Sequence, residues 1–176
     1  MMSKDMIMTT RYPNAMIYSH WFTVVLVLIA YLSSGHPTRD GLIGELHVFS
    51  GLLVASMLIV RLPLRFFYRR HIPQQPALAD WQEKAAKIVQ TALYLCMALI
   101  PLSGWLALAN KTQQFSAFGV AIPLNNNGSL LHFVGELHPF LGNLFLVLAG
   151  LHAAAALLHH FYFKDEVLKS MSPHRK

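Results

Sequence analysis

Four long apolar stretches divide this 176-residue chain, and they constrain its fold more than any other feature. A helix needs about 20 mostly apolar residues to cross the hydrocarbon core of a bilayer. Charged residues make up 12% of the chain, against about 25% in soluble domains. The pattern predicts an all-α membrane protein, a four-helix transmembrane bundle forming one domain, with spans at residues 14–32, 47–64, 88–109 and 138–163.

The positive charges are distributed unevenly between the segments that connect these spans. All but two of the 14 Lys and Arg residues lie before the first span, around the connection between the second and third, or after the fourth. The two exceptions, Arg39 and Lys111, lie on the other side. Because cytoplasmic segments are enriched in Lys and Arg, both termini are predicted to be cytoplasmic. Topology thus accounts for the net charge of +6, and no nucleic-acid partner is expected.

Several classes of site are excluded by residue types that the chain lacks. With Cys96 as the only cysteine, no intramolecular disulfide can form, and a cysteine-ligated zinc or iron–sulfur site is effectively excluded. The chain contains no Walker motif and no dinucleotide-binding fingerprint. The connection between the third and fourth spans, 110–137, is long and contains a turn followed by a predicted short interfacial helix, SLLHFVGEL.

The chain carries ten histidines, a high number for a membrane protein. A histidine inside a bilayer is unfavourable unless it is paired, hydrogen-bonded or ligated. His138 and His152 are 14 residues apart in the fourth span, about 40° short of four full helical turns. They therefore lie on nearly the same helix face, about 21 Å apart along the axis. Side chains at this spacing could each hold a metal centre, one toward each side of a bilayer.

Depth in the membrane identifies a partner for each of these two histidines. His47 opens the second span on the side where His138 opens the fourth. His20 and His152 both lie a few turns in from the cytoplasmic side. Two histidine pairs are therefore predicted, His47 with His138 and His20 with His152. His159 or His160, at the end of the fourth span, remains an alternative partner for His20.

Paired histidines in the core of a helical bundle are typical of cofactor sites. Two axial histidines leave no vacant position on a haem iron, which suits electron transfer better than oxygen binding. Gly51 and Gly142 follow His47 and His138 by one turn and could let a porphyrin approach. Arg61 lies in the apolar part of the second span, and its side chain either reaches the cytoplasmic surface or binds a haem propionate. The third span has no histidine, and it is predicted to pack against the other helices and to enclose the cofactor sites.

The chain resembles the bacterial cytochrome b561 proteins over most of its length. The likeness depends on His20-Trp21, on LHVFSG around His47 with VRLPLR after it, and above all on ELHPFLGNLFLVLAGLHAAAALLHHFYFKD. The related b-type subunits of nickel-iron hydrogenases and formate dehydrogenases share the four-helix plan. The resemblance implies a bacterial inner-membrane protein that binds two haem b groups, with four axial ligands: His20, His47, His138 and His152.

The resemblance also suggests a reaction, and three hypotheses follow. Family members of this type oxidise periplasmic superoxide to oxygen and pass the electron to ubiquinone. A second hypothesis is a membrane anchor that relays electrons from a soluble dehydrogenase partner to quinone. A third is a small transporter or structural membrane protein whose histidines bind protons or metal. A superoxide oxidase should have positive charge near its periplasmic haem, where Arg39 and Lys111 supply it and Glu45 and Glu136 oppose it.

Overall fold

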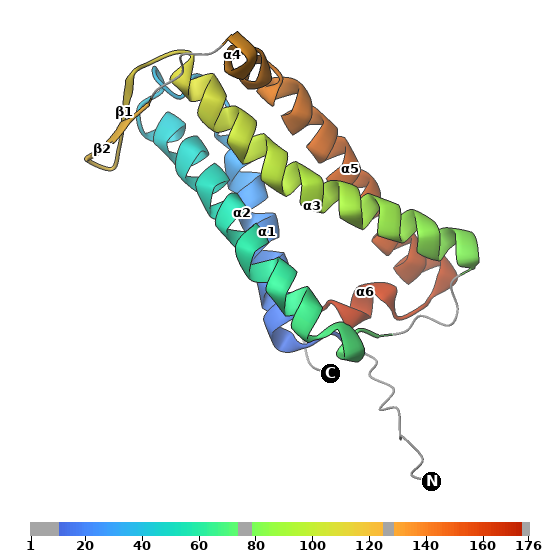
Figure 1. Ribbon diagram of the computed structural model, residues 1–176. Coiled ribbons are helices and arrows are strands. Elements are labelled where there is room, and N and C mark those ends of the chain that lie inside the picture. Colours follow the sequence, from blue (N-terminus) through green and yellow to red (C-terminus); the bar gives the residue numbers. More distant parts are fainter. Residues whose placement is uncertain (1–10, 74–78, 125–128, 174–176) are drawn as a thin grey trace.

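A computed structural model describes residues 11–73, 79–124 and 129–173 of the chain (Figure 1). Within these residues, four helices are long and apolar enough to cross a membrane, and the fourth continues from α5 into the π-helical turn η2, His159–Phe163. The predicted all-α, four-helix membrane fold is confirmed. The long helices are α1 (Asn14–Leu32), α2 (Leu42–Phe67), α3 (Asp80–Ala109) and α5 (His138–Leu158).

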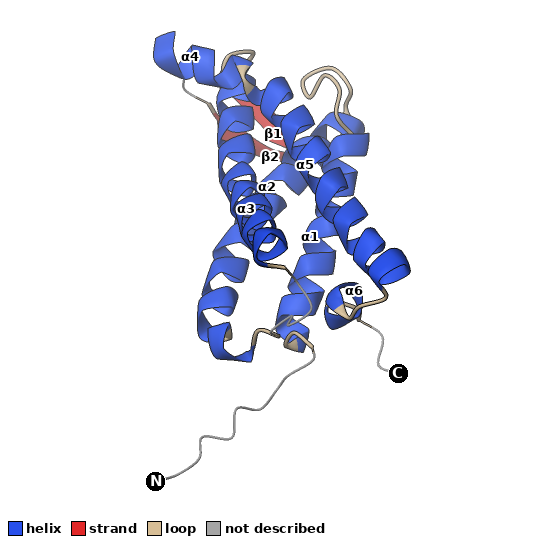
Figure 2. Ribbon diagram, turned by 90° about the vertical axis from the view of Figure 1, so that its right-hand side faces the viewer, coloured by secondary structure: helices blue, strands red, loops and turns tan. Residues whose placement is uncertain are grey.

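The helices form an elongated bundle with two different ends (Figures 1 and 2). Helix α1 packs along α2, α3 packs along α5, and α2 also contacts α3. The start of α1 and the short helix α6 (Val167–Ser170) lie at one end, called here the termini end (Figure 1). A β-hairpin and the short helix α4 (Ser129–Glu136) lie at the other, the hairpin end. The first and last described segments of the chain therefore share one end of the bundle.

Two of the long helices extend beyond the predicted apolar spans. Helix α2 begins at Leu42, directly after Gly41, whose φ of 53° is in the left-handed region. Helix α3 begins at Asp80 and continues through Pro101 without interruption. Polar residues can continue a helix past the membrane core, because the ladder of backbone hydrogen bonds does not depend on lipid. The apolar pattern therefore marks the part of a helix that suits lipid, and not its ends.

The connection between α3 and α5 contains the predicted short helix and an additional hairpin that was not predicted. Strands β1 (Gln114–Ala117) and β2 (Val120–Pro123) pair in antiparallel register. Phe115, Leu108 and Leu124 form a small buried cluster that attaches the hairpin to the bundle. Strands of four residues are too short for a reliable period-2 pattern, so no periodic signal predicts them.

The segments next to the two termini are joined at the termini end. The short helix α6 (Val167–Ser170) packs against η2. The 3₁₀ turn η1 (Arg69–His71) follows α2 almost directly. Tyr12 N–H donates to the carbonyl of Ser170 (3.1 Å) and the Trp21 indole N–H to that of Met171 (2.8 Å). The guanidinium of Arg11 donates to the carbonyl of Ser172. The carboxyl-terminal segment is thus fixed beside the start of α1.

The buried core is small, as expected for a bundle surrounded by lipid. Its main cluster consists of Leu26, Val54 and Met97, one residue from each of α1, α2 and α3, with Phe145 of α5 packed against it. Many large apolar side chains on the outside of the helices are exposed, among them Leu151, which is 60% exposed. This distribution suits a bilayer, where apolar side chains on the outer surface contact acyl chains.

Candidate functional site

Two pairs of histidines meet inside the bundle, and they are the pairs predicted from depth. The ring centres of His47 and His138 are 6.0 Å apart, with an interplanar angle of 81°. Those of His20 and His152 are 6.4 Å apart, at 74°. Each pair joins α5 to a helix of the α1–α2 layer. Because His138 and His152 belong to the same continuous helix, the two pairs lie at different depths along the bundle.

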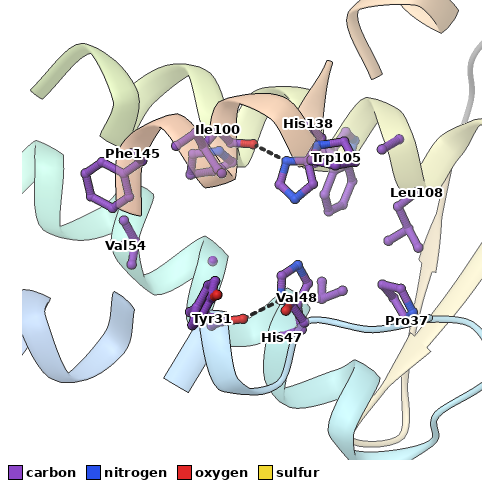
Figure 3. Close-up of a pocket in the computed structure, with 18 of the residues that line it drawn as sticks. Tyr31, Pro37, His47, Val48, Val54, Ile100, Trp105, Leu108, His138 and Phe145 are labelled. Atoms are coloured by element: carbon purple, nitrogen blue, oxygen red, sulfur yellow. Dashed lines mark hydrogen bonds between the residues drawn. The ribbon is translucent and has the colours of Figure 1, made fainter. Parts of the chain in front are cut away.

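The rings of His47 and His138 are each oriented by a backbone carbonyl. The Nδ1 of His47 lies 2.7 Å from the carbonyl oxygen of Ala30, and the Nδ1 of His138 lies 3.0 Å from that of Ile100. Since a carbonyl oxygen can only accept, each Nδ1 carries the proton and donates it. In the neutral imidazole each Nε2 then carries no proton and can bind a metal. Figure 3 shows the two rings facing each other across a cavity.

The cavity between these rings has a volume of about 460 Å³. It is lined by both histidines, by Gly51 and Gly142, and by Trp105. A Cβ atom added to either glycine would have no neighbour within 4 Å, so the helix faces beside the two rings are open. Two imidazoles bound to opposite sides of one metal ion through bonds of about 2.0 Å have their ring centres about 6 Å apart. The donor set, ring spacing and open glycine faces therefore fit a haem.

A third glycine, which the sequence analysis did not identify, makes room for the ring of His138. A Cβ atom on Gly104 of α3 would lie 2.7 Å from Cε1 and 3.0 Å from Nδ1 of that ring. The neighbouring Ser103 hydroxyl lies 3.3 Å from the same Nδ1. Helix α3 supplies no histidine, but Gly104, Ser103 and the Ile100 carbonyl position the ring of His138. The only available signal was the Ser103-Gly104 pair of small residues in an apolar span.

Gly104→Ala should therefore disturb the His138 ring. The added methyl group forces the ring to move, and overpacking of this kind costs about 1–3 kcal/mol. If this pair holds a haem, as its geometry fits, we expect a decrease of about half or more in the haem retained there, measured as the haem-to-protein ratio after purification. Gly150→Ala is the matched control, because its Cβ would meet no atom within 4 Å. Equal haem loss in both variants would show that the contact between Gly104 and His138 has no role.

The second pair has a positively charged neighbour. Nη1 of Arg61 lies 3.3 Å from Nδ1 of His20, and the guanidinium is 5.5 Å from the centre of the Tyr94 ring. The side chain of Arg61 thus lies at the His20–His152 pair. Trp21 contributes an edge contact with the ring of His20, at 5.7 Å between centres.

The alternative partners proposed for His20 lie elsewhere. The Nδ1 of His159 is 2.6 Å from the carboxylate of Asp165, so this ring is held within the η2 turn and the segment after it. His160 packs against Phe161, with 4.9 Å between ring centres. Both residues belong to the π-helical turn η2. The ring of His152 is therefore the one from the fourth membrane helix that lies beside His20.

Comparison with known proteins gives a consistent result over nearly the whole chain. A family model described as prokaryotic cytochrome b561 matches residues 11–174. Cytochrome b561 homolog 1 of Escherichia coli (strain K12) is 31% identical, over 94% of this chain and 99% of that protein. Probable superoxide oxidase CybB of Yersinia pestis is 27% identical, over 96% and 99%. Cytochrome b561 homolog 2 of Escherichia coli (strain K12) is 34% identical over 72% and 69%.

These matches agree with the fold, since four helices suited to a membrane span carry histidine pairs in their interior. The family implies b-type haem and redox chemistry. The chain belongs to the prokaryotic cytochrome b561 family and is a membrane cytochrome of electron transport.

Proposed function

We propose that this protein binds two haem b groups and carries electrons across the bacterial inner membrane, from superoxide at the hairpin end to ubiquinone. The observation that carries the proposal is the convergence of four histidines as two pairs at different depths. In this proposal His47 and His138 would hold the iron of one haem, and His20 and His152 would hold that of the other. Both termini are cytoplasmic, which places the hairpin end in the periplasm.

The haem iron would supply one-electron chemistry, because it can accept and release a single electron without binding substrate. The protein's own residues hold each imidazole in place and limit the access of water. For the first pair, the carbonyls of Ala30 and Ile100 fix both rings through their Nδ1 atoms. Two superoxide ions give up two electrons and become two molecules of oxygen. Ubiquinone takes up those two electrons with two protons and becomes ubiquinol.

Arg61 has a role at the second pair. If His20 binds iron through Nε2, its Nδ1 carries the proton and cannot accept a hydrogen bond from a guanidinium, which has only donors. Arg61 is then available for an anionic group at the same place. We propose that it binds a haem propionate, because Arg forms strong paired hydrogen bonds with carboxylates.

Superoxide consumption by the purified protein tests the proposed reaction. With added ubiquinone and no other protein, we expect superoxide to disappear and ubiquinol to form in a ratio of two to one. If the protein consumes no superoxide but copurifies with a soluble dehydrogenase that reduces its haem, the membrane-anchor function replaces this proposal. If the purified protein has no b-type absorption band in the reduced-minus-oxidised spectrum, the transporter or structural hypothesis replaces both.

Charge at the cavity gives a further prediction for superoxide as the donor. Lys111 lines the cavity of His47 and His138, and Glu136 lines it too and opposes its charge. Lys111→Gln should lower the second-order rate with superoxide by about tenfold and weaken its dependence on salt, because charge at a cleft steers small ions. Arg39→Gln is the control, since it removes the same charge in the exposed α1–α2 connection. Equal decreases in both variants would rule out steering by Lys111.

A further inference from the structure

The β1–β2 hairpin contacts α2 on both sides of His47. The Phe118 N–H at the hairpin tip donates to a carboxylate oxygen of Glu45 (3.2 Å), two residues before His47. The ring of Phe118 meets the ring of Phe49, two residues after it, with 5.4 Å between centres. Strand β1 also contacts α2. The hairpin therefore holds the helical turn that carries one of the proposed haem ligands.

The same hairpin supports the wall of the cavity in front of His47. Phe115 of β1 is buried against Leu108, and Val48 packs on this cluster. Leu108 and Val48 also line the cavity between His47 and His138 (Figure 3). One face of this wall touches the hairpin and the other faces the cavity. Displacement of the hairpin would therefore expose the proposed haem site to water.

The backbone conformation at the hairpin tip indicates that the side chain of Phe118 makes stabilising contacts. Phe118 and Gly119 have φ values of 50° and 80°. A two-residue hairpin turn with both φ values positive favours Asn-Gly or Asp-Gly. A bulky residue is unfavourable in the left-handed region and persists only where surrounding contacts compensate. Here the compensating contact of the side chain is that with the ring of Phe49, because the hydrogen bond to Glu45 is donated by the backbone N–H and does not require a phenyl ring.

We propose that Phe118 is a positioning residue for the haem of the His47–His138 pair. By holding the hairpin against Phe49, its ring fixes the start of α2 and keeps the cavity wall closed to water. The inference depends on the proposed function, since it takes this pair as haem ligands. Solvent exposure is one of the factors that set a haem potential. Water near the iron stabilises the more highly charged ferric form, so exposure should lower the potential.

Phe118→Asn tests this role, because it suits the turn while removing the ring. We expect both haems to be retained and thermal stability not to decrease. The redox equilibrium of one haem should shift about tenfold toward the oxidised form, equal to about 59 mV for one electron. The same shift should occur in a His20→Ala background, which on our proposal retains only the His47–His138 haem. Phe118→Tyr, which keeps the ring, should restore the original potential.

Other outcomes would overturn the inference. Unchanged potentials in Phe118→Asn would mean that the ring does not position this site, and equal shifts in both haems would mean a general structural effect. Failure of the proposed function appears separately, as wild-type protein without haem at this pair. In that case hydrogen exchange of the α2 amides around His47 still tests Phe118, since the Asn variant should exchange faster. Unchanged exchange would reject its positioning role.

Discussion

Replacing His47 or His138 with alanine should remove one haem and leave the other in place. Each change removes one of two proposed haem ligands, and loss of partners outside the ligand shell already costs about 10- to 100-fold in metal affinity. We therefore expect the haem-to-chain ratio to decrease from two to about one. The remaining haem should keep the absorption spectrum and potential of the His20–His152 site. Haem extraction and a redox titration of the purified variants measure both quantities.

The two variants should behave alike, because the rings are 6.0 Å apart and are proposed to share one iron. The double variant His47→Ala, His138→Ala should lose no more haem than either single variant. Additive losses, with both haems gone in the double variant, would contradict the pairing. So would the retention of two haems in either single variant.

Replacing His152 or His20 with alanine should remove the other haem and stop electron transfer to ubiquinone. The His47–His138 haem should still be reduced by superoxide, because its ligands are intact. Without the second haem the electron has no further carrier, so steady-state ubiquinol formation should decrease to the rate without protein. Rapid-mixing absorbance should then show one phase of haem reduction followed by no turnover.

A neighbouring histidine provides the matched control for this prediction. His160 lies near the end of the helix that carries His152. His160→Ala therefore changes this helix but leaves the rings of His20 and His152, which are 6.4 Å apart, in place. We expect this variant to keep two haems and normal turnover. If His160→Ala lost a haem and His152→Ala did not, the partner of His20 would be His160, and our assignment of the second site would be wrong.

The helical fold and the meeting of histidines could be predicted because a bilayer imposes few choices. Its thickness sets the length of each apolar stretch, and the fixed rise of a helix converts residue number into depth. His138 and His152 thus have known depths, and a partner must lie at the same level on another helix. The same reasoning allows His159 and His160, as well as His152, as partners for His20. The structure distinguishes them, because His159 is hydrogen-bonded to Asp165 and His160 packs against Phe161, whereas the ring of His152 lies beside His20.

The remaining features depend on tertiary contacts that no periodic pattern encodes. The carbonyl of Ala30 orients His47 from another helix, and Gly104 makes room for His138 across a helix interface. The hairpin consists of two four-residue strands, and Phe-Gly at its tip is not the usual signal for such a turn. The direction of the Arg61 side chain cannot be predicted from the sequence, because a long side chain can reach either the surface or the interior.

The most direct test of the account is the number and spin state of haem irons in each purified chain. Quantitative haem extraction against protein mass, combined with electron paramagnetic resonance of the oxidised protein, measures both. We predict two haem b groups per chain, both low-spin, because each iron should have two imidazole ligands. A ratio of one or zero, or a stoichiometric high-spin signal from an iron with a vacant position, would contradict the two-pair arrangement.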